Sequence, residues 1–229
     1  MTDQATPTDQ PPPFRGRFQY SRAELIADGV VHAVGIVLAI AAGSALLALS
    51  LFRTGPGEYI AAVFYVISLL TVLSVSLAYN LWPMTPAKWI LRRFDHAAIY
   101  LLIAATYTPF LAQMDDVALG GSMTALVWCA AVAGMMVKML LPGRYDRLAV
   151  VFYLAIGWSG VVILRPLLNT LPSSALWLLL AGGIVYSSGV VFFAWHRLRF
   201  QSAVWHGFVV VGAGLHFAAV MDCLVVDRL

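Results

Sequence analysis

The chain has 229 residues, of which 61% are hydrophobic and only 11% charged, with a mean hydropathy of +0.85 and a formal net charge of +3. Soluble domains carry about 25% charged residues, so this chain has too few polar side chains to cover a water-facing surface. The basic residues lie between apolar runs and form no stripe, so we expect no nucleic-acid partner.

Residues 1–20 are polar and proline-rich, with almost nothing to bury, and we expect a disordered tail ahead of a membrane domain at 21–229. Seven apolar runs follow, each near the ~20 residues that a membrane-crossing helix needs. The sequence therefore predicts an all-α membrane protein, a seven-transmembrane helix bundle. The predicted spans are approximately 26–52, 59–82, 95–113, 119–141, 147–167, 174–195 and 203–226.

The lysines and arginines favour one orientation of this bundle. Only Arg53, Arg165 and Arg228 fall on one side of the predicted membrane, and the other 11 of the 14 fall on the opposite side. Since cytoplasmic loops carry an excess of Lys and Arg, we expect the N-terminus in the cytoplasm and the C-terminus outside. The 11 basic residues on the predicted cytoplasmic side are Arg15, Arg17, Arg22, Lys88, Arg92, Arg93, Lys138, Arg144, Arg147, Arg197 and Arg199.

Unusual polar residues gather at the predicted cytoplasmic ends of four spans. A carboxylate or histidine inside a membrane is costly and tends to face protein or water, which makes it a functional candidate. Asp95, at the start of the third span, is the first candidate for a catalytic residue. The others form pairs four residues apart, on one helical face each. These pairs are Asp28 with His32, Ser76 with Asn80, and Ser202 with His206.

Each candidate also has a structural interpretation. Asp28 fits the first turn of a helix, where the dipole favours a carboxylate. His32 is suited to a hydrogen bond between helices. Asp95 and His206 can form an ion pair that only holds two helices together. His216 lies about 15 Å deeper than His206 by the helical rise, and we favour a structural role for it as well.

Four segments resemble the hemolysin III family, the bacterial branch of the superfamily that includes the adiponectin and progestin receptors. RRFDHAAIYLLIAATYTPF at Arg92–Phe110 resembles the signature segment of that family. The resemblance extends through AELIADGVVHAVG at Ala23–Gly35, AGGIVYSSGVVFFAW at Ala181–Trp195 and AVWHGFVVVGAGLHF at Ala203–Phe217.

The resemblance implies a zinc site, held by one histidine that closes span two and two that open span seven, beside the aspartate of span three. Here Asn80 and Ser202 occupy two of those histidine positions, and only His206 and Asp95 remain. A catalytic zinc needs about three protein ligands, and an amide or hydroxyl is a poor one. We therefore expect no zinc cofactor, and a hydrogen-bonded cluster in its place.

The resemblance implies a multi-pass protein of the bacterial inner membrane with membrane lipids as partners. We expect a role in membrane-lipid homeostasis or sensing. The alternative is a zinc-dependent hydrolase of lipid amides or esters, with zinc on Asp95, His206 and a recruited His32 or Asp28. A pore or transporter is a weaker alternative, because the polar residues cluster at one end.

Overall fold

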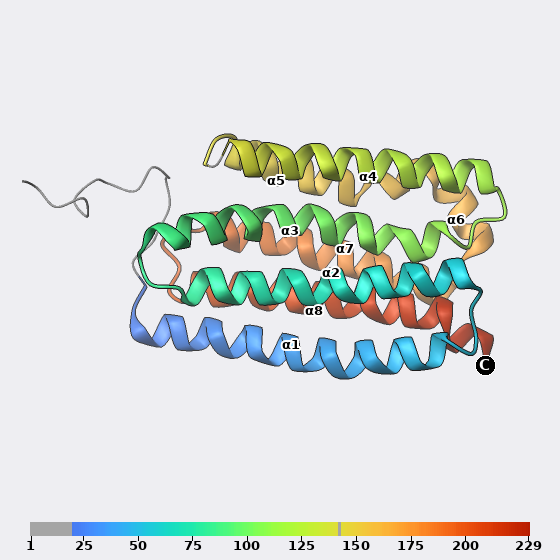
Figure 1. Ribbon diagram of the computed structural model, residues 1–229, viewed down its shortest axis with the longest axis horizontal. Helices are drawn as coiled ribbons and strands as arrows, with labels where there is room; N and C mark the ends of the chain where they lie inside the picture. Colours follow the sequence, from blue (N-terminus) through green and yellow to red (C-terminus); the bar gives the residue numbers. More distant parts are fainter. Residues whose placement is uncertain (1–19, 142) are drawn as a thin grey trace, which may run out of the picture.

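The computed structural model describes residues 20–141 and 143–229, and these form a bundle of helices with no β-strand among them (Figure 1). The predicted tail lies outside the described residues except for Tyr20. In chain order the elements are α1 Arg22–Ser50, α2 Pro56–Leu81, α3 Pro86–Leu111, α4 Val117–Leu140, α5 Asp146–Gly157, η1 Ser159–Ile163, α6 Leu164–Thr170, α7 Ser173–Ala194, α8 Gln201–Leu224 and η2 Val226–Arg228.

The all-α membrane architecture predicted from the sequence is confirmed. Within the described residues, 6 helical segments are long and apolar enough to cross a membrane: α1, α2, α4, the stretch from Leu148 to Thr170, α7, and α8 with η2. The remaining long helix, α3, falls outside that set because Asp95 and His96 interrupt its apolar run. It has 26 residues and packs between α2 and α4 as the seventh member of the bundle.

The predicted fifth span is not one continuous α-helix. It consists of α5, η1 and α6, with the break just after Gly157. Inside a membrane, backbone groups released by such a break must be satisfied by other parts of the protein. The Tyr107 hydroxyl of α3 does this: it donates to the Gly157 carbonyl at 2.7 Å and accepts from the Gly160 N–H at 2.8 Å. The break is therefore fixed by a neighbouring helix.

The helices form a closed arrangement, because the last helix returns to the first. The helices from α1 to α5 each pack against the next, α5 contacts α7, and α8 packs against both α7 and α1 (Figure 1). The main apolar core lies inside this arrangement and includes Leu46, Tyr65, Leu69, Val220 and Leu224, all nearly inaccessible to solvent. The adjacency of α1 and α8 is what brings polar residues from the two ends of the sequence together.

The described part of the chain begins at Tyr20 and ends at Leu229, at opposite ends of the bundle (Figure 1). We call the end where α1, α3 and α8 begin the site end. At the other end, Arg228 of η2 donates to the Glu58 carboxylate of α2 and to the Gln113 side chain after α3. These contacts close the bundle at the end far from the polar candidates.

Candidate functional site

The start of α1 is tied to the start of α8 by one carboxylate, Glu24. One oxygen of Glu24 accepts from the Ser21 backbone N–H at 2.8 Å, which completes a capping box for α1. The other oxygen accepts from the Phe200 N–H at 3.2 Å, just ahead of α8. Phe200 has φ of 59°, a left-handed conformation that is costly for a bulky residue. The carboxylate therefore helps to hold a strained turn and sets α8 beside α1.

Glu24 was not among the candidates predicted from the sequence, although the sequence contains a pattern that predicts its role in capping α1. Serine followed three residues later by glutamate, ahead of an apolar run, is the pattern of a capping box. Ser21 and Glu24 fit that pattern. The contact with α8 could not be foreseen from it.

A glycine allows α1 and α8 to approach closely near the polar residues. A Cβ atom at Gly35 would lie 2.9 Å from Cγ2 of Val210 on α8, closer than real Cβ contacts. Gly35 lies one turn beyond His32, and Val210 one turn beyond His206. Small residues of this kind let membrane helices pack backbone to backbone. The close approach at this level places the two histidines side by side.

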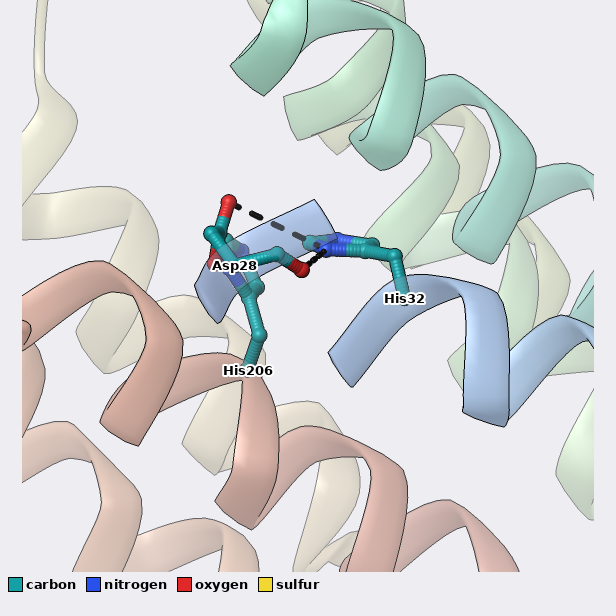
Figure 2. Close-up of side chains that lie close together, drawn as sticks. All are labelled: Asp28, His32 and His206. Carbon is teal, nitrogen blue, oxygen red and sulfur yellow. Dashed lines mark hydrogen bonds and ion pairs between the residues drawn. The ribbon is translucent and has the colours of Figure 1, made fainter. Parts of the chain in front are cut away.

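Asp28, His32 and His206 form the centre of the candidate site (Figure 2). Their exposed fractions are 2%, 1% and 9%. His206 Nδ1 lies 2.6 Å from Asp28 Oδ1, and His32 Nδ1 lies 3.8 Å from Asp28 Oδ2. The two imidazole rings have their centroids 4.3 Å apart. One carboxylate and two imidazoles are thus gathered in a buried space between α1 and α8.

Ser76 and Asn80 of α2 border this centre. The Ser76 hydroxyl lies 3.5 Å from His206 Nε2. The Asn80 amide donates back along its own helix, to the Ser76 carbonyl at 2.9 Å and to the Ser76 hydroxyl at 3.3 Å. Lys88 of α3 donates to the backbone carbonyls of Asn80 at 3.2 Å and Trp82 at 2.8 Å, where α2 ends. Asn80 is therefore engaged within α2 and makes no hydrogen bond to α8.

Asp95 of α3 lies at the edge of the same site. It is buried, it interacts with the Ser76 hydroxyl, and it is within electrostatic range of His206, Arg92 and Asp28. The sequence allowed an ion pair between Asp95 and His206, but the hydrogen bond of His206 to a carboxylate runs to Asp28. The pairing differs because α8 packs extensively on α1 and only slightly on α3.

Ser202 adds only a weak contact. Its hydroxyl lies 3.4 Å from His206 Nδ1 on the same helix, at the nitrogen that faces Asp28. The structure therefore brings together all the predicted candidates from α1, α2, α3 and α8 except His216.

His216 lies apart from the site and packs against α7. Its Nδ1 donates to the Gly212 carbonyl at 2.8 Å, and its ring lies 5.3 Å from the ring of Tyr186. A Cβ at Gly182 would lie only 2.4 Å from His216 Nδ1. The side chain therefore fills a space that a glycine leaves open, which is a packing role.

A second group of charged residues lies at the site end, apart from Asp28, His32 and His206. Asp146, at the start of α5, accepts from Arg92 of α3 at 2.8 Å and from Lys138 of α4 at 2.7 Å. Burial by itself raises the pKa of Asp146, but the hydrogen bonds from Lys138 and Arg92 outweigh it and hold that pKa below its usual value. This group ties three helices together and keeps a surplus of positive charge at the site end.

Comparison with known proteins agrees with the resemblance described above. The chain matches the family model described as Haemolysin-III related over residues 22–217. It is 35% identical over 211 residues to the Hemolysin-3 homolog of Bacillus subtilis (strain 168), covering 90% of this chain and 97% of that protein. It is 33% identical over 198 residues to Hemolysin-3 of Bacillus cereus, covering 86% and 90%. The human Monocyte to macrophage differentiation factor is 31% identical over 218 residues, covering 93% and 89%.

Proposed function

Because the chain belongs to the hemolysin III family, we propose that it acts in membrane-lipid homeostasis or in sensing the state of the membrane. One observation carries the proposal: the buried polar cluster of Asp28, His32, Ser76, Asp95 and His206 at one end of an apolar bundle. Polar and ionisable groups inside a membrane are costly, and where they are retained they usually serve function.

The zinc site that the family resemblance implies does not fit this chain. Two of its three ligand positions hold Asn80 and Ser202, whose amide and hydroxyl groups suit hydrogen bonds better than zinc. The Asn80 amide donates to Ser76 within α2, and the Ser202 hydroxyl lies against His206 within α8. We therefore propose that the protein works without the family's own set of ligands.

The arrangement favours a site at one end of the bundle over a pore. Beyond the polar cluster, the described core is apolar, with residues such as Leu46, Tyr65, Leu69 and Val220 filling the space between the helices. A water-filled path needs polar groups along its length.

The orientation that we propose places the site end in the cytoplasm. Several basic residues lie in or next to the helix termini at this end, whereas Arg228 lies at the other end. They are Lys88, Arg92, Lys138 and Arg197. An excess of basic residues marks the cytoplasmic side of membrane proteins. The compartment that we propose is the bacterial inner membrane, where the site would face the inner leaflet.

Deletion of the gene in its host tests the proposed role. Two quantities are measured before and after a drop in temperature. Mass spectrometry gives the acyl-chain composition of the lipids, and a fluorescent probe gives the membrane order. We expect the deletion to change both, and wild type and His196→Ala to restore them. His196 is exposed and lies outside the site, so it is the matched control for His206→Ala, which should not restore them. Unchanged lipids and order in the deletion strain would overturn the proposal.

A second candidate function is hydrolysis of a lipid amide or ester. The observation that favours it is a second buried carboxylate, Asp95, which lies within electrostatic range of His206. A carboxylate and a histidine at one site can act as general base and general acid. Release of fatty acid from a fluorescent ceramide by the purified protein, lost in Asp95→Asn, would support it. No release above the Asp95→Asn background would exclude that substrate.

A further inference from the structure

We infer that Asp28, His32 and His206 form a binding site for a divalent transition-metal ion of the zinc type, distinct from the ligand set that the family resemblance implies. The inference goes beyond the proposed function and does not depend on it. Only His206 is common to both ligand sets. The two other ligands come from α1, in place of the implied positions Asn80 on α2 and Ser202 on α8.

The donor atoms are near enough to converge on one ion. One ligand atom from each of the three residues lies within 4.8 Å of the others. Two ligands bound to a tetrahedral zinc at about 2.0–2.1 Å from the metal lie about 3.3 Å from each other. The donor atoms are thus at most about 1.5 Å farther apart than they would be around a bound ion. Two imidazoles and one carboxylate are a ligand set that zinc enzymes and non-haem iron enzymes both use.

The hydrogen bonds of His32 prepare it as a ligand. Its Nδ1 lies 2.9 Å from the backbone carbonyl of Asp28. A carbonyl can only accept, so Nδ1 carries the proton and Nε2 of the neutral ring keeps its lone pair. Metal-binding histidines commonly donate their other ring N–H to a carbonyl or carboxylate, which fixes the tautomer and the ring orientation.

His206 is held in a comparable way. Its Nδ1 donates to Asp28 Oδ1 at 2.6 Å, and its Nε2 lies 3.5 Å from the Ser76 hydroxyl. An ion bound by Nδ1 and an oxygen of Asp28 would take the place of the proton that lies between these two atoms. The Ser76 hydroxyl could then accept from the Nε2–H on the opposite side of the ring.

The charges around the site suit a dication. A buried charge is tolerated only when other charges compensate it. Asp28 supplies one negative charge, and Asp95, within electrostatic range of Asp28 and His206, supplies a second. The two carboxylates would balance an ion of charge +2, and Arg92, which is also within electrostatic range of Asp95, is itself paired with Asp146.

The ligand types select among metals. Imidazole nitrogens suit zinc, copper, iron and nickel, whereas magnesium and calcium prefer sites built of oxygen ligands. The site therefore should take up Zn²⁺ and Co²⁺ and should ignore Mg²⁺.

The test is metal titration of the purified full chain in mild detergent after removal of metal with a chelator. We expect one Zn²⁺ per chain by elemental analysis, and Co²⁺ should give visible absorption bands of a coordinated ion. Asp28→Ala, His32→Ala and His206→Ala should each weaken Zn²⁺ binding at least about tenfold. His196→Ala and Asn80→Ala, which lie outside the three ligands, should leave it unchanged.

A gentler variant keeps the test decisive if an alanine variant fails to fold. His32→Asn can still donate to the Asp28 carbonyl, but it lacks the ring nitrogen that would bind the ion. We expect a folded protein, by circular dichroism and gel filtration, that has lost Zn²⁺ binding. Wild-type protein that binds no Zn²⁺ would overturn the inference, leaving only a hydrogen-bonded cluster. Zn²⁺ binding that survives in folded His32→Asn would overturn it as well.

Discussion

Gly35→Ala tests whether the close approach of α1 and α8 builds the site. The new Cβ would lie 2.9 Å from Cγ2 and 3.5 Å from Cγ1 of Val210, and a valine in a helix has little freedom to rotate away. Overpacking of this kind costs about 1–3 kcal/mol, whereas alanine is favoured over glycine in a helix by about 1 kcal/mol. The net loss should therefore be about 0–2 kcal/mol.

The matched control is Gly207→Ala on α8, where a Cβ meets no atom within 4 Å. It keeps the gain in helix propensity without the clash, so the two variants should differ by about 1–3 kcal/mol in free energy of unfolding. Unfolding of the purified protein by a denaturing detergent, followed by circular dichroism, measures this difference. Val210→Ala should relieve the clash when combined with Gly35→Ala. Equal stability of the two glycine variants, or no rescue by Val210→Ala, would refute the packing described here.

Three further substitutions have defined outcomes in the same unfolding assay. Tyr107→Phe removes the acceptor of the Gly160 N–H at the break after α5, which should cost about 1–3 kcal/mol; no change would mean that another group satisfies the break. Glu24→Ala removes the capping box and the link to α8 and should cost about 1–2 kcal/mol, while Glu24→Asp, too short to reach both partners, should recover only part of it. Arg228→Lys loses the paired hydrogen bonds to Glu58 at the far end and should cost about 1 kcal/mol without altering Zn²⁺ binding.

The bundle itself could be predicted from the sequence because each span is a long apolar run bounded by turn residues. The helices α1, α2, α4, α7 and α8 lie close to their predicted bounds. The break in the fifth span was missed, and the backbone groups at the break are satisfied by Tyr107, a residue of another helix. Hydropathy along one helix carries no information about such a contact.

The gathering of the polar residues was foreseeable for a different reason. In an antiparallel bundle, the starts of odd spans and the ends of even spans share one side, so Asp28, Ser76, Asp95 and His206 had to lie at similar depth. Their pairing was not foreseeable, because it depends on how each helix is rotated and on which helices touch. Asp28 and not Asp95 contacts His206 because Gly35 lets α1 lie against α8.

The zinc content of four purified proteins tests most directly whether the site has moved from the family positions to α1. We predict one Zn²⁺ per chain for wild type and almost none for His32→Asn. Adding Asn80→His and Ser202→His to His32→Asn rebuilds the implied family set around His206, and that protein should bind one Zn²⁺ again. The fourth, Asn80→Ala, should match wild type. Zinc retained in His32→Asn, or lost in Asn80→Ala, would contradict the assignment of the ligands to α1.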